Sequence, residues 1–131
     1  MSDSGPPKHW PFEVYDPADF KVSERVATVI RVVTHEYEDE KQALAERINE
    51  NAIHYGWQGI TNHFVIDNLG NICTGRPLEE VPMISETETD RRMILILSAK
   101  TELAQNSLQA LCQSIIDASA LVRREIVVSH V

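Results

Sequence analysis

Histidines, cysteines and carboxylates are the side chains of this sequence that could bind a metal ion or transfer a proton. The imidazoles and thiols are His9, His35, His54, His63, His130, Cys73 and Cys112. No two of them have a spacing that zinc sites use within one element, such as HxxxH on a helix or a CxxC pair. A zinc site would therefore have to be assembled from distant parts of the chain, and we expect both cysteines to be small buried hydrophobic residues.

Signatures of other catalytic classes are missing from the sequence. It contains no GxSxG elbow, no GxxxxGK[ST] loop and no GxGxxG turn, which argues against a serine hydrolase, a P-loop protein and a dinucleotide-binding domain. Carboxylates such as Glu79, Glu80, Glu86 and Glu88 lie in a polar stretch at residues 76–92. Acid–base catalysis needs burial to separate the pKa values of two carboxyls, so this stretch is interpreted as an acidic surface loop.

Length and charge limit the classes of protein that this chain can belong to. A chain of 131 residues can form one compact domain. Its 12 basic and 20 acidic residues give a net charge of −8, which argues against nucleic-acid and membrane partners and is compatible with a basic partner. No apolar run is long enough to span a bilayer, and no basic-then-apolar pattern opens the sequence. We therefore expect synthesis in the cytoplasm without a signal peptide.

The first 25 residues combine prolines with aromatic side chains. Four prolines in this range disfavour a helix and indicate an extended N-terminal arm. We expect its aromatic residues to be candidates for binding a neighbouring protein, and they are Trp10, Phe12, Tyr15 and Phe20. A disordered leader is the alternative interpretation.

Residues 26–131 alternate between patterns typical of strands and of helices. Strands are expected at residues 26–33, 62–67, 71–74, 93–97 and 126–129, the second and third forming a β-hairpin. A first helix would carry an apolar stripe of Leu44, Ile48, Ala52 and Tyr55. A second helix, capped by Thr101, would bury Ala104, Leu108, Leu111, Ile115 and Ala118. The order βα-ββ-βα-β predicts a single α/β domain with a mixed central β-sheet flanked by helices.

The segment HYGWQGITNHFVIDNLGNICTGRPLEEVP, at residues 54–82, resembles the hallmark of the type 2 N-acetylmuramoyl-L-alanine amidases. That family includes peptidoglycan-recognition proteins and the amidase-type lysozymes of some bacteriophages. Its pattern is a GW, a GYHFxI strand, an xDG turn and GRPLxxVGAH. The resemblance extends over residues 26–131, because IVVSHV is similar to the strand that ends in a ligand histidine. It implies an amidase-like domain after the arm of residues 1–25.

The family holds one Zn²⁺ with two histidines and a third ligand, and a zinc-bound water attacks the amide between muramic acid and L-alanine. Carried over by resemblance, the first ligand falls on Val33, and His35 is the substitute that a register shift of two would supply. The second ligand falls on His130, and the sequence ends before the segment of the third. The assisting tyrosine falls on Asn62. The resemblance thus implies no catalytic residue and no cofactor.

Two further residues of the hallmark have expected structural roles. The resemblance implies that His63 is not a metal ligand, and alternation along the strand indicates a packed or hydrogen-bonded histidine. Arg76 is expected to pair with Glu79 or Glu80 at the surface, where such pairs contribute little stability.

Three functions remain open from the sequence. The leading hypothesis is a catalytically inactive amidase-fold protein that acts as a binding or assembly module. Its partners would be proteins, either neighbouring virion subunits of a phage tail or baseplate, or a host protein that it regulates. The second hypothesis is an active zinc amidase that cleaves peptidoglycan, its metal held by His35, His130 and a further group. The third is a noncatalytic peptidoglycan-binding protein.

Overall fold

The computed structural model describes residues 12–21, 29–36, 41–55, 59–80, 93–118 and 125–130, with only the backbone described at 41–43 and 125–130. In chain order the elements are the 3-10 helix η1 (Pro17–Asp19), β1 (Val29–His35), α1 (Lys41–His54), β2 (Phe64–Ile66), β3 (Ile72–Thr74), β4 (Met93–Ala99), α2 (Glu102–Ala118) and β5 (Glu125–His130). The expected order βα-ββ-βα-β is confirmed.

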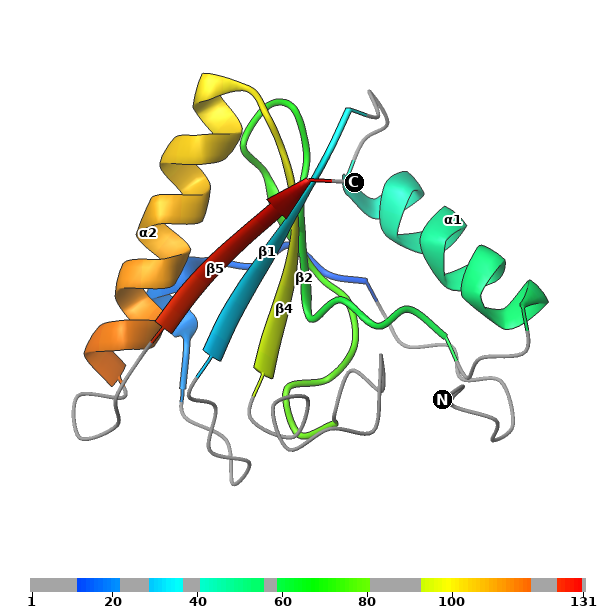
Figure 1. The fold of residues 1–131 in the computed structure, drawn as a ribbon, viewed down its shortest axis with the longest axis horizontal. Coiled ribbons are helices and arrows are strands. Elements are labelled where there is room, and N and C mark those ends of the chain that lie inside the picture. Colours follow the sequence, from blue (N-terminus) through cyan, green and yellow to red (C-terminus); the bar gives the residue numbers. More distant parts are fainter. Residues whose placement is uncertain are drawn as a thin grey trace.

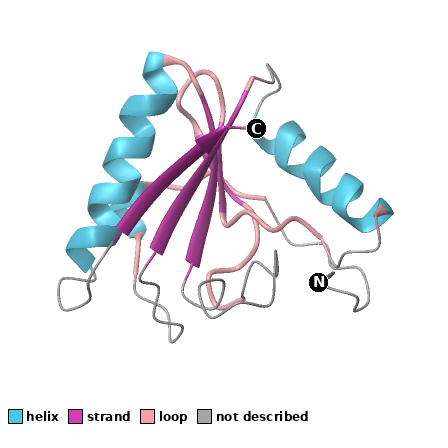
Figure 2. Cartoon of the chain, in the orientation of Figure 1, coloured by secondary structure: helices cyan, strands magenta, loops and turns pink. Residues whose placement is uncertain are grey.

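The strands form one mixed sheet in the order β3-β2-β4-β1-β5. Strand β1 is parallel to β4 and β5, β2 is parallel to β4, and β3 is antiparallel to β2. Helices α1 and α2 lie on opposite faces of this sheet, as Figures 1 and 2 show. Every residue of β4 is buried, because this strand lies at the centre of the sheet and is covered on both faces.

Two hydrophobic cores fill the spaces between the sheet and its helices. The α2-side core contains the sheet residues Ile30, Val32, Phe64, Ile66, Ile72, Ile94, Ile96 and Ala99. The α1-side core contains Leu44, Ala45, Ile60, Val65, Cys73 and Leu97. Successive residues of a strand point to opposite faces, so β1, β2, β3 and β4 each have side chains that belong to or pack against both cores. The core to which a strand side chain belongs therefore shows on which face of the sheet that side chain lies.

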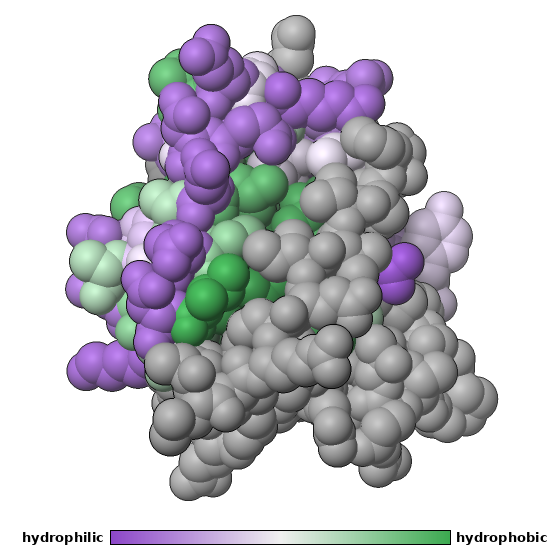
Figure 3. Space-filling model, turned by 60° about the vertical axis from the view of Figure 1, so that its left-hand side comes forward, coloured by the Kyte–Doolittle hydropathy of each residue, from purple (hydrophilic) through white to green (hydrophobic). Residues whose placement is uncertain are grey.

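Helix α2 presents an apolar face to the sheet, as the sequence predicts. Its buried residues are Ala104, Leu108, Leu111, Cys112 and Ile115. The expected cap is confirmed, because Oγ1 of Thr101 accepts a hydrogen bond from the Ala104 amide at 3.2 Å. The prediction for Ala118 is wrong, because this residue of the last turn is exposed. The outward face of α2 carries a ridge of hydrophilic side chains (Figure 3).

Helix α1 covers the other face and is tied to the chain that leads into β2. Leu44 is fully buried, and the buried Asn49 accepts a hydrogen bond from the Ile60 amide at 2.8 Å. The predicted apolar stripe ends earlier than expected. Tyr55 is 78% exposed, because it follows the last residue of the helix and the helical periodicity no longer directs it toward the sheet. No helix in the described parts of the chain is both long and apolar enough to cross a membrane.

The predicted hairpin of β2 and β3 is confirmed, and its turn is stabilised by side-chain hydrogen bonds. Oδ1 of Asp67 accepts from the amides of Leu69 at 3.0 Å and Asn71 at 2.9 Å. Gly70 has a φ of +83°, and a Cβ there would lie 2.6 Å from the Leu103 carbonyl oxygen. The hairpin tip therefore packs closely against the first turn of α2.

The strand expected at residues 26–33 ends later than predicted. Strand β1 is Val29–His35, so it includes His35, and residues 22–28 lie outside the described part of the chain. Parallel pairing with β4 extends β1 beyond its run of β-branched residues, as far as the pair His35 and Ala99. Tertiary pairing, rather than local composition, determines where this strand ends.

The described part of the expected arm, residues 12–21, adds to the edge of the sheet. The Tyr15 amide donates to the Ile72 carbonyl oxygen at 2.9 Å, and the Thr74 amide donates to the Glu13 carbonyl oxygen at 2.9 Å. The segment therefore pairs with β3, which would otherwise be an edge strand. In Figure 1 this segment, in blue, crosses behind the strands from the α1 side to the α2 side.

Candidate functional site

The two histidines that could bind zinc lie in adjoining strands. Val33, at the first ligand position, lies on the α1 face and packs against the α1-side core. His35 is only 3% exposed, and its Nε2 lies 3.0 Å from the Ile66 carbonyl oxygen. The backbone of His130 pairs with Thr34 of β1, whereas His35 pairs with Ala99 of β4.

These residues do not fit a family zinc site. Val33 has no donor atom. Nε2 of His35 donates to a carbonyl oxygen, which leaves only Nδ1 of that ring as a possible ligand atom. Among the residues with described side chains, no three histidines, cysteines or carboxylates are grouped closely enough to hold a metal ion. The side chain of His130 lies outside that description.

Asn62, at the position of the assisting tyrosine, is part of a tightly packed crossing of two segments. The residue is 8% exposed, and its backbone carbonyl oxygen accepts a hydrogen bond from the Arg76 amide at 2.8 Å. A Cβ at Gly75 would lie 2.3 Å from that same oxygen. The glycine is therefore needed for close approach, and this part of the hallmark serves the fold.

His63 is a hydrogen-bonded structural residue. It is 1% exposed, its Nδ1 accepts from the Leu95 amide at 3.0 Å, and its Nε2 donates to the Glu80 carbonyl oxygen at 2.8 Å. Both ring nitrogens are engaged in a way that defines the neutral tautomer with a proton on Nε2. The imidazole thus connects β4 to the loop after β3, in agreement with the expected structural role.

Arg76 corrects the expectation of a surface ion pair. Its side chain is 2% exposed, and Nη1 donates to the Ile60 carbonyl oxygen at 3.2 Å. Nη2 lies 3.9 Å from Oε1 of Glu80, whose side chain is 29% exposed. The acidic stretch is thus anchored at its start by a buried guanidinium, and residues 81–92 of that stretch lie outside the described part of the chain.

Three of the four aromatic residues expected as candidates for partner binding pack partly on the chain's own cores. Phe12 packs against the α1-side core, and Tyr15 and Phe20 pack against the α2-side core. The rings of Tyr15 and Phe64 have centroids 4.7 Å apart. Because an extended segment that pairs with β3 can pack its rings on its own sheet, these three half-buried side chains contribute to the fold. Trp10 lies outside the described residues.

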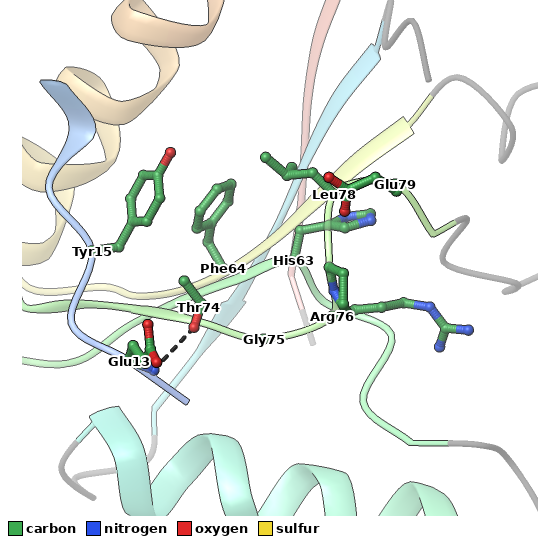
Figure 4. Close-up of a pocket in the computed structure, with 10 residues that line it drawn as sticks. Glu13, Tyr15, His63, Phe64, Thr74, Gly75, Arg76, Leu78 and Glu79 are labelled. Carbon is green, nitrogen blue, oxygen red and sulfur yellow. Dashed lines mark hydrogen bonds between the residues drawn. The ribbon is translucent and has the colours of Figure 1, made fainter. Parts of the chain in front are cut away.

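A hollow of about 260 Å³ lies between residues 13–15 and residues 74–79, and we call it the arm pocket. Figure 4 shows Tyr15 and Phe64 beside one another at one side of it and Leu78 and Glu79 at the other. The Arg76 side chain extends away from the two rings (Figure 4). The amide of Glu13 donates to Oγ1 of Thr74 at 3.0 Å.

Three groups among the described residues have shifted pKa values. Burial raises the pKa of the Tyr15 hydroxyl, and the carboxylates of Asp19 and Asp16 raise it further. Burial also raises the pKa of the Cys112 thiol to about 11, which makes it a poor nucleophile near neutrality. A hydrogen bond from Lys100 lowers the pKa of the exposed Glu36 carboxyl.

Comparison with solved structures identifies the fold class. An N-acetylmuramoyl-L-alanine amidase, LysC, from Clostridium intestinale URNW has a TM-score of 0.68 and 18% identity, over 94% of this chain and 80% of that chain. The endolysin N-acetylmuramoyl-L-alanine amidase LysCS from the same organism also has a TM-score of 0.68, with 20% identity over 95% and 82% of the two chains. No family model and no curated protein matches the sequence. The chain therefore has an amidase-type fold, as the hallmark segment predicts.

Sequence reasoning missed the arm pocket. Its lining comes from segments about 60 residues apart in the sequence. The guanidinium of Arg76 is buried, so the exposed charges of the lining are carboxylates, and local sequence does not indicate this burial. The one usable signal is the mixture of prolines and aromatic residues in the first 25 residues, which predicts a surface for a partner rather than one wall of a pocket.

Proposed function

We propose that this chain is an amidase-fold protein that binds and does not hydrolyse, acting as a module for protein–protein assembly. The observation that carries the proposal is Val33, an aliphatic residue packed in the α1-side core where the resemblance places the first zinc ligand. His35 is buried with Nε2 on the Ile66 carbonyl oxygen, so it could offer only Nδ1, and one such donor does not make the three-ligand site that the chemistry needs. The fold is kept while a donor that the chemistry requires is replaced.

Features unrelated to metal chemistry support a binding role. The hallmark residues with described side chains serve packing and hydrogen bonding, as His63 and Arg76 do. A bacteriophage setting, as a tail or baseplate subunit or as a regulator of a host protein, is supported by the resemblance to the amidase-type lysozymes of phages. The acidic balance of the chain favours a basic protein partner over nucleic acid or an anionic membrane.

Metal content and peptidoglycan release test the proposal directly. Protein purified without chelator is analysed by mass spectrometry for bound metal, and cell-wall fragments are measured with and without added Zn²⁺, with an active amidase as positive control. We expect substoichiometric zinc and no release. A ligand at a hundred times its dissociation constant stabilises by about 2.7 kcal/mol, so bound zinc would also raise the thermal midpoint by several degrees. About one zinc per chain together with release would overturn the proposal.

The amidase-type fold makes a peptidoglycan-related function the second candidate. An active enzyme would need His35 and His130 to be completed by a third donor, and His35→Asn would then abolish both zinc binding and release. A noncatalytic peptidoglycan receptor would bind muropeptides without metal. A muropeptide pull-down that retains the protein in the presence of chelator would favour that receptor over the assembly module.

A further inference from the structure

The arm pocket combines an aromatic wall, an apolar wall and acidic rim residues. The aromatic wall is the half-buried Tyr15 ring, which packs on the buried Phe64 ring, and Leu78 packs with them on the α2-side core. Glu13 and Glu79 also line the pocket, and both are exposed. All of these groups lie on the α2 face or at the sheet edge, whereas Val33 packs on the α1 face.

The charge in and around this pocket is negative. Among the described lining residues, the one charged basic side chain is Arg76, whose guanidinium is buried and donates to the Ile60 carbonyl oxygen, and His63 is neutral with a proton on Nε2. Figure 4 shows that this guanidinium points away from Tyr15. Asp16 and Asp19 add negative charge beside Tyr15, which is why they contribute to raising the pKa of its hydroxyl. An incoming cation therefore meets carboxylates and ring faces, with no accessible positive group among the lining residues.

We propose that the arm pocket binds the side chain of a lysine from a partner polypeptide. The alkyl stem of lysine fits between the Tyr15 ring and Leu78, and its ammonium group is attracted by the acidic rim, where Glu13 lies at one side and Glu79 at the other. The inference deepens the proposed function by stating the chemistry of the partner, and it rests on the chain being a binding module.

A polypeptide is the occupant because a second hollow adjoins the arm pocket at Tyr15. This hollow, of about 470 Å³, is lined by Val14, Asp16 and Ala110 among others. Val14 is 70% exposed there and offers an apolar contact beside another carboxylate. A single amine would fill the arm pocket alone, whereas a polypeptide segment with a lysine beside apolar residues can occupy both hollows.

Backbone amide NMR tests the arm pocket with a defined probe, N-acetyl-L-lysine methylamide. We expect saturable shifts at the amides of Thr74 and Gly75, which line the pocket. The Nε-acetylated form of the probe has the same stem without the charge, and we expect it to bind about tenfold more weakly. Shifts that are absent at these amides, or equal for the two probes, would overturn the proposal.

Paired charge variants provide the matched control. Glu13→Gln with Glu79→Gln removes two charges at the pocket, and we expect the dissociation constant to rise about fivefold. Glu46→Gln with Glu50→Gln removes two exposed charges from α1, on the opposite face, and should leave the constant within about twofold. An equal loss in both pairs would show nonspecific attraction to an acidic protein and would refute a built site.

Partner type is tested by a second step with the same NMR reporters. A peptide with one lysine flanked by leucines should bind more tightly than the single-residue probe, because it also reaches the hollow beside Val14. A muropeptide that binds here in preference to this peptide would overturn the assignment to a polypeptide. Zinc content and peptidoglycan release are measured separately. Absence of lysine binding in the arm pocket would therefore refute this inference alone, whereas zinc binding with peptidoglycan release would refute the proposed function.

Discussion

Replacing Arg76 by methionine tests whether this buried guanidinium stabilises the fold through a backbone carbonyl or through an ion pair. Methionine keeps much of the length of the side chain and removes its charge and donors. Nη1 is 3.2 Å from the Ile60 carbonyl oxygen, whereas Nη2 is 3.9 Å from Oε1 of Glu80. The shorter contact is buried, and the longer one ends on a carboxylate that is 29% exposed.

The two contacts predict different energies. Losing a charge-assisted hydrogen bond and leaving the Ile60 carbonyl oxygen without this donor should cost about 2–4 kcal/mol. At about 4 Å, the Coulomb attraction to Glu80 is about 1 kcal/mol in water and about 4 kcal/mol at a near-surface dielectric, before desolvation is subtracted. Because Glu80 remains partly hydrated, we expect Glu80→Gln to cost less than about 1 kcal/mol.

Urea denaturation of the wild type, Arg76→Met, Glu80→Gln and the double variant gives the free energies of unfolding and a coupling energy. We expect the coupling energy to stay below about 1 kcal/mol. A coupling above about 2 kcal/mol, or equal losses in the two single variants, would refute the assignment to the carbonyl and make the ion pair the main stabilising contact.

Three other changes have expected outcomes. Gly70→Ala places a Cβ 2.6 Å from the Leu103 carbonyl oxygen at a φ of +83°, so unfolding free energy should fall by about 1–3 kcal/mol in denaturation experiments. Thr101→Ala removes the cap on the Ala104 amide and should cost about 1–2 kcal/mol; an unchanged midpoint would show that the cap contributes nothing. Because the folded-state pKa of Cys112 is raised to about 11, its stabilising contribution is present below pH 9 and lost as pH rises through 11. Thermal midpoints measured across this range should fall less steeply for Cys112→Ala.

The elements with strong local periodicity were predictable from the sequence. The face of α2 follows from apolar residues at helical spacing and from Thr101, and both are confirmed. The predicted element boundaries are wrong where the helical periodicity ends and where pairing with a neighbouring strand determines the end of a strand. Tyr55 lies just past a helix end, and His35 belongs to a strand that ends where its neighbour's pairing ends. Local sequence carries little information about either boundary.

The role of the arm could be predicted only in part. Proline and aromatic content correctly indicate an extended segment that contacts a protein surface, but they do not say whose surface. The hydrogen bond from the Tyr15 amide to the Ile72 carbonyl oxygen places the segment on its own sheet. That pairing depends on β3 having an uncovered edge, which is a property of strand order and not of residues 12–21.

The same pairing forms one wall of the proposed binding site, on the face of the sheet opposite Val33. Pairing with β3 brings the Tyr15 ring to Phe64, and the crossing of Asn62 with Gly75 directs the following loop back past the same ring. Neither contact involves Val33, so substitutions on the α1 face leave the arm pocket intact. Under the proposed function, an amidase-type fold would carry valine at a ligand position on one face of its sheet and bind a partner in the acidic hollow on the other.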